Sequence, residues 1–212
     1  MKRLSMWAFG IKSFKPGLNP VARNLAGALL ALGALPTAVA QVPTPPSITI
    51  SANAPSPAEL NADLPGSQLS GSAKLTYWGF DVYNASLWVT PDFQPDRYAQ
   101  HPFALQLTYL RGLDGNAIAK RSLEEMLRQA SIAPERARAW QTAMASIFPD
   151  VKSGDRITGI HKPGTGARFL VNGKVRGDIA DVEFSRLFFG IWLSDATSEP
   201  GMRKSLLKLK PT

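Results

Sequence analysis

The fold is decided by the segment at residues 148–193, FPDVKSGDRITGIHKPGTGARFLVNGKVRGDIADVEFSRLFFGIWL. Short apolar and β-branched runs between turn residues predict strands at residues 155–162, 167–171 and 174–179. The dipeptide Asn172-Gly173 predicts a two-residue hairpin turn, because such a turn needs positive φ at both positions. A helix is predicted over residues 182–193, where apolar residues recur with helical spacing: Phe184, Leu187, Phe188, Ile191 and Trp192.

The chain before this segment predicts strands first and two helices second. Apolar and polar residues alternate over residues 69–89 and again over 103–109, as in half-buried strands. Gly79 interrupts the first run, and we expect it to mark a bulge or a close approach to the backbone. Apolar stripes predict helices over residues 119–130 and 134–148, and Pro200 begins a last short helix. This order favours an α+β fold with helices on one face of a mainly antiparallel sheet.

Residues 1–40 have the composition of a secretory signal peptide. Basic residues precede an apolar run at residues 25–35, and Ala38-Val39-Ala40 supplies the small residues of a cleavage site. The run is about half of the ~20 residues that span a bilayer, so we expect cleavage before Gln41 and no membrane span afterwards. The mature protein is then periplasmic, with a linker rich in Pro, Ser and Ala at residues 41–58 and one domain at residues 59–212.

Charge and composition exclude several classes of protein. The chain has 24 Lys and Arg against 16 Asp and Glu, a formal net charge of +8, but five of the basic residues lie in the first 40. Most of the basicity therefore belongs to the export signal, and we expect no nucleic-acid partner. There is no cysteine, which excludes disulfides and a lipoprotein anchor. No metal or cofactor is predicted, because His101 and His161 lie in no metal-binding or nucleophile motif.

Four segments together resemble the chalcone isomerase-like proteins of bacteria: residues 71–80 with 82–83, 107–111 with 121–122, 148–155, and 172–193. The resemblance covers residues 64–209 and implies an open-faced β-sandwich with a layer of helices on the sheet. The family holds plant isomerases that cyclise chalcones, fatty-acid-binding relatives and exported bacterial proteins. This chain is most similar to the last group.

The resemblance places Thr76 at the position of the family's polar threonine and predicts an arginine upstream of that strand. Residues 63–66 read DLPG there instead. Cyclisation needs donors that stabilise an enolate-like charge, so the missing arginine argues against it. The resemblance therefore implies a non-catalytic binding or accessory protein without a cofactor. The alternatives are an isomerase of the intramolecular-lyase type on another substrate, and a structural protein whose cleft is filled by side chains.

Arg111 and Tyr109 are the first candidates for ligand binding. Arg111 follows a predicted strand that ends beside Tyr109, and a guanidinium fork suits a carboxylate. Arg121 follows on the first predicted helix. The alternative is that these arginines only form surface ion pairs, with Asp114 or Glu125.

Trp78 and Tyr83 are candidates for the apolar wall of the same site, with Thr76 beside them in sequence. In a regular strand Trp78 and Tyr83 point to opposite faces, so only one of them faces a ligand. The alternative is that both rings simply pack against the sheet. From these residues we expect a small apolar or aromatic acid as the ligand.

Overall fold

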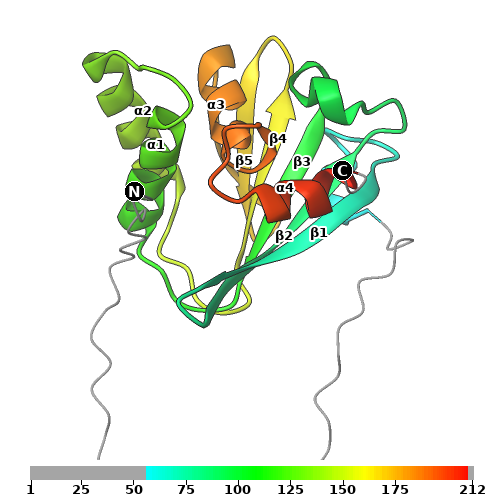
Figure 1. Ribbon diagram of the computed structural model, residues 1–212, viewed down its shortest axis with the longest axis horizontal. Helices are drawn as coiled ribbons and strands as arrows, with labels where there is room; N and C mark the ends of the chain where they lie inside the picture. The colour runs from blue at the N-terminus through cyan, green and yellow to red at the C-terminus, as the bar shows by residue number, and fades with distance from the viewer. Residues whose placement is uncertain (1–55, 210–212) are drawn as a thin grey trace, which may run out of the picture. The chain divides into compact units, whose positions relative to one another are not determined.

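Within residues 56–209, six strands form one antiparallel sheet in the order in which they occur along the chain. The computed structural model describes residues 56–209 (Figure 1). The predicted signal peptide, and the predicted linker as far as residue 55, lie outside the described residues. The strands are β1 (Gln68–Tyr77), β2 (Phe80–Val89), β3 (Phe103–Tyr109), β4 (Arg156–Lys162), β5 (Gly166–Val171) and β6 (Lys174–Ile179).

The main hydrophobic core lies between this sheet and the α-helices. The helices α1 (Gly115–Leu127) and α2 (Pro134–Ile147) connect β3 to β4, whereas α3 (Val182–Leu193) and α4 (Pro200–Leu207) follow β6. The predicted α+β class, with helices on one face of an antiparallel sheet, is confirmed. The opposite face buries a smaller cluster next to the short turn η1 (Ala58–Leu60): Leu60, Leu64, Leu69, Trp88, Ala104, Ile160 and Leu170. A second short turn, η2 (Pro95–Gln100), precedes β3.

Helix α3 begins at a strong N-cap. The Asp181 carboxylate accepts hydrogen bonds from the backbone N–H of Glu183 and Phe184, and from Nε1 of Trp140 at 3.0 Å. Burial by itself would raise the pKa of Asp181, but these hydrogen bonds and the nearby Arg136 hold the pKa below its usual value. The predicted apolar stripe of α3 is buried in the core: Phe184, Leu187, Phe188, Ile191 and Trp192.

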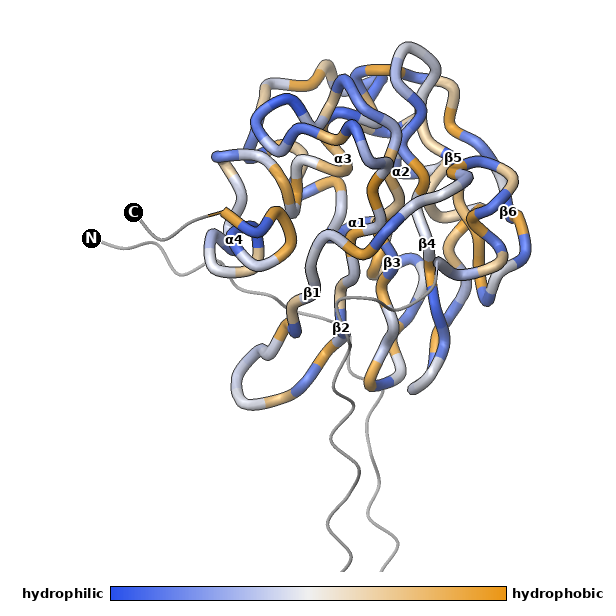
Figure 2. The backbone as a smooth tube through the Cα atoms, turned by 90° about the vertical axis from the view of Figure 1, so that its right-hand side faces the viewer, coloured by the Kyte–Doolittle hydropathy of each residue, from blue (hydrophilic) through white to orange (hydrophobic). Residues whose placement is uncertain are grey.

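Helix α4 covers the edge strand β1 at very close range. A Cβ atom at Gly71 would lie 2.1 Å from the carbonyl oxygen of Ser205, so only glycine allows this approach. The Ser70 hydroxyl donates to the carbonyl oxygen of Leu206 at 3.0 Å. Figure 2 shows α4 beside β1 in the side view. The helix thereby protects an edge strand that would otherwise be open to pairing with other chains.

Trp78 and Gly79 form a two-residue turn between β1 and β2, with Tyr77 opposite Phe80. Their φ angles are 50° and 78°. The expectation of a bulge or a close approach at Gly79 is wrong, because the glycine lies in the turn and no atom of residues 56–209 lies within 4 Å of a Cβ built there. The alternation of residues hid the turn, since a bulky residue such as tryptophan rarely adopts a positive φ.

Candidate ligand-binding site

An apolar cavity lies between the sheet and helices α1 and α3. Its space for water-sized spheres is about 50 Å³, whereas one water needs roughly 10–15 Å³. The wall comes from strands β2, β3 and β4, from α1 and the segments that flank the α1–α2 pair, and from α3: Tyr83, Leu107, Tyr109, Leu113, Ile118, Arg121, Ser122, Glu125, Phe148, Ile157, Phe188, Ile191 and Trp192.

Two tyrosines from neighbouring strands form one wall of the cavity. Tyr83 of β2 and Tyr109 of β3 are cross-strand partners, and their rings meet edge to face with centroids 6.1 Å apart. The Tyr83 hydroxyl accepts a hydrogen bond from Nε1 of Trp192 at 3.0 Å. The Tyr109 side chain is 2% exposed, and its hydroxyl has no hydrogen-bond partner within residues 56–209. Burial raises the pKa of both phenols, so both are neutral at physiological pH.

The polar residues of the opposite wall lie on one face of α1. Arg121 forms ion pairs with Glu125 and, at 3.1 Å, with Glu124. Glu125 is only 3% exposed and also pairs with Arg128 at 3.3 Å. Glu199 is close enough to Glu125 to feel its negative charge. The pKa of Glu199 is raised first by burial and then by the charge of Glu125. The cation of the cavity is therefore already balanced by a buried carboxylate.

The structure brings together two of the five residues proposed from the sequence. Tyr83 and Tyr109 line the cavity, whereas Thr76, Trp78 and Arg111 do not. Thr76 donates to Asp81 at 2.7 Å on the exposed hairpin, and Trp78 is in the turn. Arg111 lies over the ring of Phe80, 4.9 Å from its centroid.

The position of Arg111 follows from where the strand ends. If β3 continued, Arg111 would share a face with Tyr109, but β3 ends at Tyr109 and the chain bends at residues 110–111. Arg111 forms no ion pair with Asp114 or Glu125 within the described part of the chain. The ion-pair alternative applies instead to Arg121, which pairs with Glu125.

The comparison with known proteins agrees with this architecture. A family model described as chalcone isomerase-like matches residues 55–208. The chain belongs to the chalcone isomerase-like family. Among solved structures, a fatty-acid-binding protein of Arabidopsis thaliana is similar, with a TM-score of 0.54 and 12% sequence identity, covering 67% of this chain and 87% of that chain. At this identity the likeness shows a shared fold alone. No curated protein matches the chain in sequence.

Glu125 and Ser122 complete the polar wall of this chalcone isomerase-like protein, and sequence reasoning did not assign them to a site. Ser122 donates its hydroxyl to the carbonyl oxygen of Ile118 at 2.9 Å. The spacing of Arg121 and Glu125 was the only signal, because side chains four apart meet on a helix. Ion pairs of this spacing usually lie in solvent, and the neighbouring residues in the sequence do not indicate that this pair faces a cavity.

Other polar clusters of this family member have a structural role. His161 Nδ1 lies 2.7 Å from the Ser185 hydroxyl, and its Nε2 lies 2.9 Å from the carbonyl oxygen of Ala99. Ser185 is fully buried, and neither His161 nor Ser185 lines the cavity. Residues 56–209 contain no group of three His, Cys, Asp or Glu side chains suited to a metal ion. None of the helices in the same range is long and apolar enough to cross a membrane.

Proposed function

We propose that this protein binds an apolar carboxylic acid in the cavity and does so without catalysis. The observation that carries the proposal is the Tyr109 hydroxyl, which is buried in an apolar cavity without a partner within residues 56–209. This hydroxyl can donate a hydrogen bond to a ligand oxygen in the cavity, and such a bond contributes about 0.5–1.5 kcal/mol. A related fold carries the name of a fatty-acid-binding protein, which supports an acid as the ligand.

The ligand's carboxylate is placed between Tyr109 and Arg121, at the polar end of the cavity. The phenol donates one hydrogen bond, and the guanidinium supplies a charge-assisted one. Arg121 has to share its charge with Glu125, which keeps Arg128 as a second partner. This sharing makes binding moderate in strength, because the carboxylate displaces an existing ion pair rather than meeting an unpaired cation.

The size of the cavity limits the ligand. The space of about 50 Å³ for water-sized spheres is enough for only a few water molecules, so it fits only a small ligand without rearrangement. Helix α1 packs mainly on α2 and α3 rather than on the sheet, so an outward movement of α1 is the route by which longer chains enter. We therefore propose small aromatic acids and short-chain acids as ligands that need the least rearrangement.

Calorimetry with 3-phenylpropionate and pentanoate tests the proposal. Both acids should bind the protein, and Tyr109→Phe should weaken binding by about tenfold, because it removes only the hydroxyl. Tyr98→Phe is the matched control, since Tyr98 lies outside the cavity and packs on Phe103. Absence of binding by the unaltered protein, or equal affinity for Tyr109→Phe, would contradict the proposal.

Arg111 remains a separate candidate from the sequence, and the same titration tests it. If Arg111 grips the carboxylate, as proposed with Trp78 and Thr76 beside it, then Arg111→Ala weakens binding. If the carboxylate lies between Tyr109 and Arg121, then Arg111→Ala leaves the affinity unchanged. We favour the second result, because Arg111 stacks on Phe80 outside the cavity wall.

An isomerase of the intramolecular-lyase type is the second candidate function. It is favoured by one observation, that a neutral phenol and a guanidinium line the same apolar cavity. Incubation of the purified protein with a 2′-hydroxychalcone decides the matter. We expect no cyclisation above the uncatalysed rate, and a rate well above it would make the protein an enzyme.

We further propose that the mature protein is periplasmic and begins at Gln41. The proposal rests on the apolar run and the small residues before Gln41. N-terminal sequencing of the protein from a cell fractionation tests it. A chain that still begins at Met1, or that remains with the cytoplasm, would refute it.

A further inference from the structure

Two hairpin turns of the same geometry contain very different residues. Trp78-Gly79 joins β1 to β2 with φ angles of 50° and 78°, and Asn172-Gly173 joins β5 to β6 with 49° and 79°. Asparagine adopts this left-handed conformation readily, whereas a bulky aromatic residue is strained in it. Trp78 is 78% exposed, and within residues 56–209 its ring pairs with one other aromatic ring, that of Tyr77, at 6.0 Å between centroids. Fold stability therefore does not explain why a tryptophan occupies the turn.

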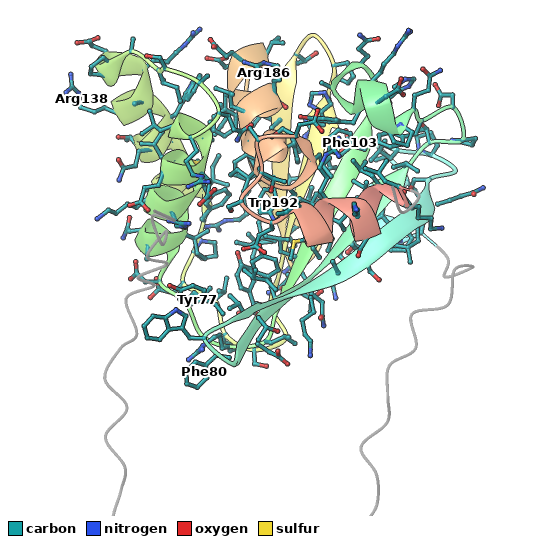
Figure 3. The ribbon with its side chains drawn as sticks, in the orientation of Figure 1. Tyr77, Phe80, Phe103, Arg138, Arg186 and Trp192 are labelled. Carbon is teal, nitrogen blue, oxygen red and sulfur yellow. The ribbon has the colours of Figure 1, made fainter. Side chains whose placement is uncertain are left out.

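The strained turn holds a small group of aromatic rings beside a cation. Phe80 is 57% exposed, and Arg111 lies over its ring. Arg111 forms no ion pair within the described residues, whereas the neighbouring Lys74 and Asp81 neutralise each other at 2.7 Å. Figure 3 shows Tyr77 and Phe80 at the end of the hairpin, away from the helices α3 and α4. We call residues 77–80 together with Arg111 the aromatic tip.

We propose that the aromatic tip is a docking site for the interfacial layer of a phospholipid bilayer. Tryptophan and tyrosine rings concentrate at the level of lipid headgroups, because the ring is apolar and its edge carries a polar group. An arginine beside them matches the phosphate of a headgroup. The tip consists of only a few residues. A stable protein partner or a second copy needs about 800 Å² on each side, from roughly 20–30 residues.

The tip lies at the same end of the sheet as the cavity. Phe80 precedes Tyr83 on β2, and Arg111 follows Tyr109 of β3. Tyr83 and Tyr109 are cross-strand partners, and the Leu110 N–H donates to the carbonyl oxygen of Val82 at 2.9 Å. Docking of the tip therefore places the cavity end of the sheet next to the lipid bilayer, in which apolar acids dissolve. Membrane binding itself is independent of the proposed ligand and is measured without one.

Tryptophan fluorescence isolates the tip in the full-length chain. Three of the other tryptophans are buried: Trp88, Trp140 and Trp192. The fourth, Trp7, lies outside the described residues and is removed by the substitution Trp7→Phe. Trp78 then remains as the exposed reporter. Vesicles of phosphatidylethanolamine and phosphatidylglycerol should shift its emission to the blue, and brominated lipids in the same vesicles should quench it. Unchanged emission at saturating vesicle concentration would overturn the proposal, even if another segment tethers the chain.

A substitution taken from the second hairpin separates docking from folding. Trp78→Asn reproduces the Asn-Gly turn, so the thermal midpoint should be unchanged or higher while vesicle affinity falls by about tenfold or more. Arg111→Gln should weaken binding to these anionic vesicles and reduce its dependence on salt. Val175→Asn is the matched control, because Val175 is 58% exposed on β6, and it should bind as the unaltered protein does.

Two results would assign the tip to another role. Equal vesicle affinity for Trp78→Asn and the unaltered protein would show that the tip does not touch the membrane. Self-association that is lost in Trp78→Asn, seen by sedimentation in the absence of lipid, would assign the tip to a second copy of the chain instead.

Discussion

The two ends of the interface between α3 and the sheet are built from different aromatic residues. Toward the N-terminal end of α3, Phe184 and Phe188 stack with centroids 5.5 Å apart and pack on Phe169 of β5. Toward the C-terminal end, Trp192 meets Tyr83, and a cavity lies beside them. Phe184 and Phe169 lie outside the cavity wall and Phe188 forms part of it, whereas the C-terminal end combines rings that carry polar atoms with unfilled space.

This difference separates stability from function along one helix. Close packing of apolar rings gains dispersion energy and leaves no polar atom to satisfy. A cavity loses dispersion contacts, and the Tyr109 hydroxyl beside it has no hydrogen-bond partner within residues 56–209. Proteins retain such local costs where a ligand compensates for them. The end with the cavity is therefore where binding is expected, and the phenylalanine end is expected to hold the fold.

Phe184→Ala is expected to have the largest effect on stability. Phe184 is fully buried and contacts Trp140, Phe169 and Phe188. Truncation should lower the free energy of unfolding by roughly 3–5 kcal/mol, through lost burial and the remaining cavity. Trp192→Ala at the other end should fall in the same range, because Trp192 is also buried. Urea denaturation measures both, and a change below about 1 kcal/mol for Phe184→Ala would disprove the proposed division.

Asp181→Ala should lower the free energy of unfolding by roughly 2–4 kcal/mol. The substitution removes the N-cap of α3, worth about 0.5–2 kcal/mol, and leaves the buried Trp140 N–H without its acceptor. Because the folded pKa lies below 3.8, the stabilisation by Asp181 is present above that pH and is lost as pH falls through the lowered folded pKa. Thermal unfolding from pH 6 downward should show a larger loss of stability in the unaltered protein than in Asp181→Ala.

The two cavity tyrosines should respond differently to loss of the hydroxyl. Tyr83→Phe leaves the Trp192 N–H without an acceptor and should cost about 1–3 kcal/mol. Tyr109→Phe removes a hydroxyl that has no hydrogen-bond partner within the described range, so stability without ligand should stay within about 0.5 kcal/mol or rise. Denaturation of both variants without ligand makes the comparison. A similar loss in both would show that Tyr109 has a structural partner.

The smallest expected effect concerns Glu199 and has the opposite sign to that of Asp181. Burial and then the charge of Glu125 raise its pKa in the folded protein. Its contribution to stability is therefore most favourable below pH 4.5 and is lost as pH rises through the raised folded pKa. Glu199→Gln should slightly raise the thermal midpoint at pH 7 and leave it unchanged at pH 4. A lower midpoint at pH 7 would mean that the charge of Glu199 is stabilising.

Local patterns in the sequence determined most of the fold. The Asn172-Gly173 turn, the three strands of residues 155–179 and the apolar stripe of α3 are confirmed, since turn chemistry and residue periodicity act between near neighbours. The α+β class and the chalcone isomerase-like family also followed from the sequence. The turn at Trp78-Gly79 did not, because its residues contradict the usual preference for positive φ.

Only the tertiary structure decided the candidate site. Tyr83 and Tyr109 are far apart in sequence and meet through strand pairing, while Arg121 and Glu125 reach the same cavity through the packing of α1 on α3. Arg111 and Trp78 have the right chemistry for a ligand site but face outward, because β3 ends at Tyr109 and β1 ends at the turn. Which side chains share a cavity depends on where strands end and helices dock, and these are long-range packing outcomes that a local pattern does not contain.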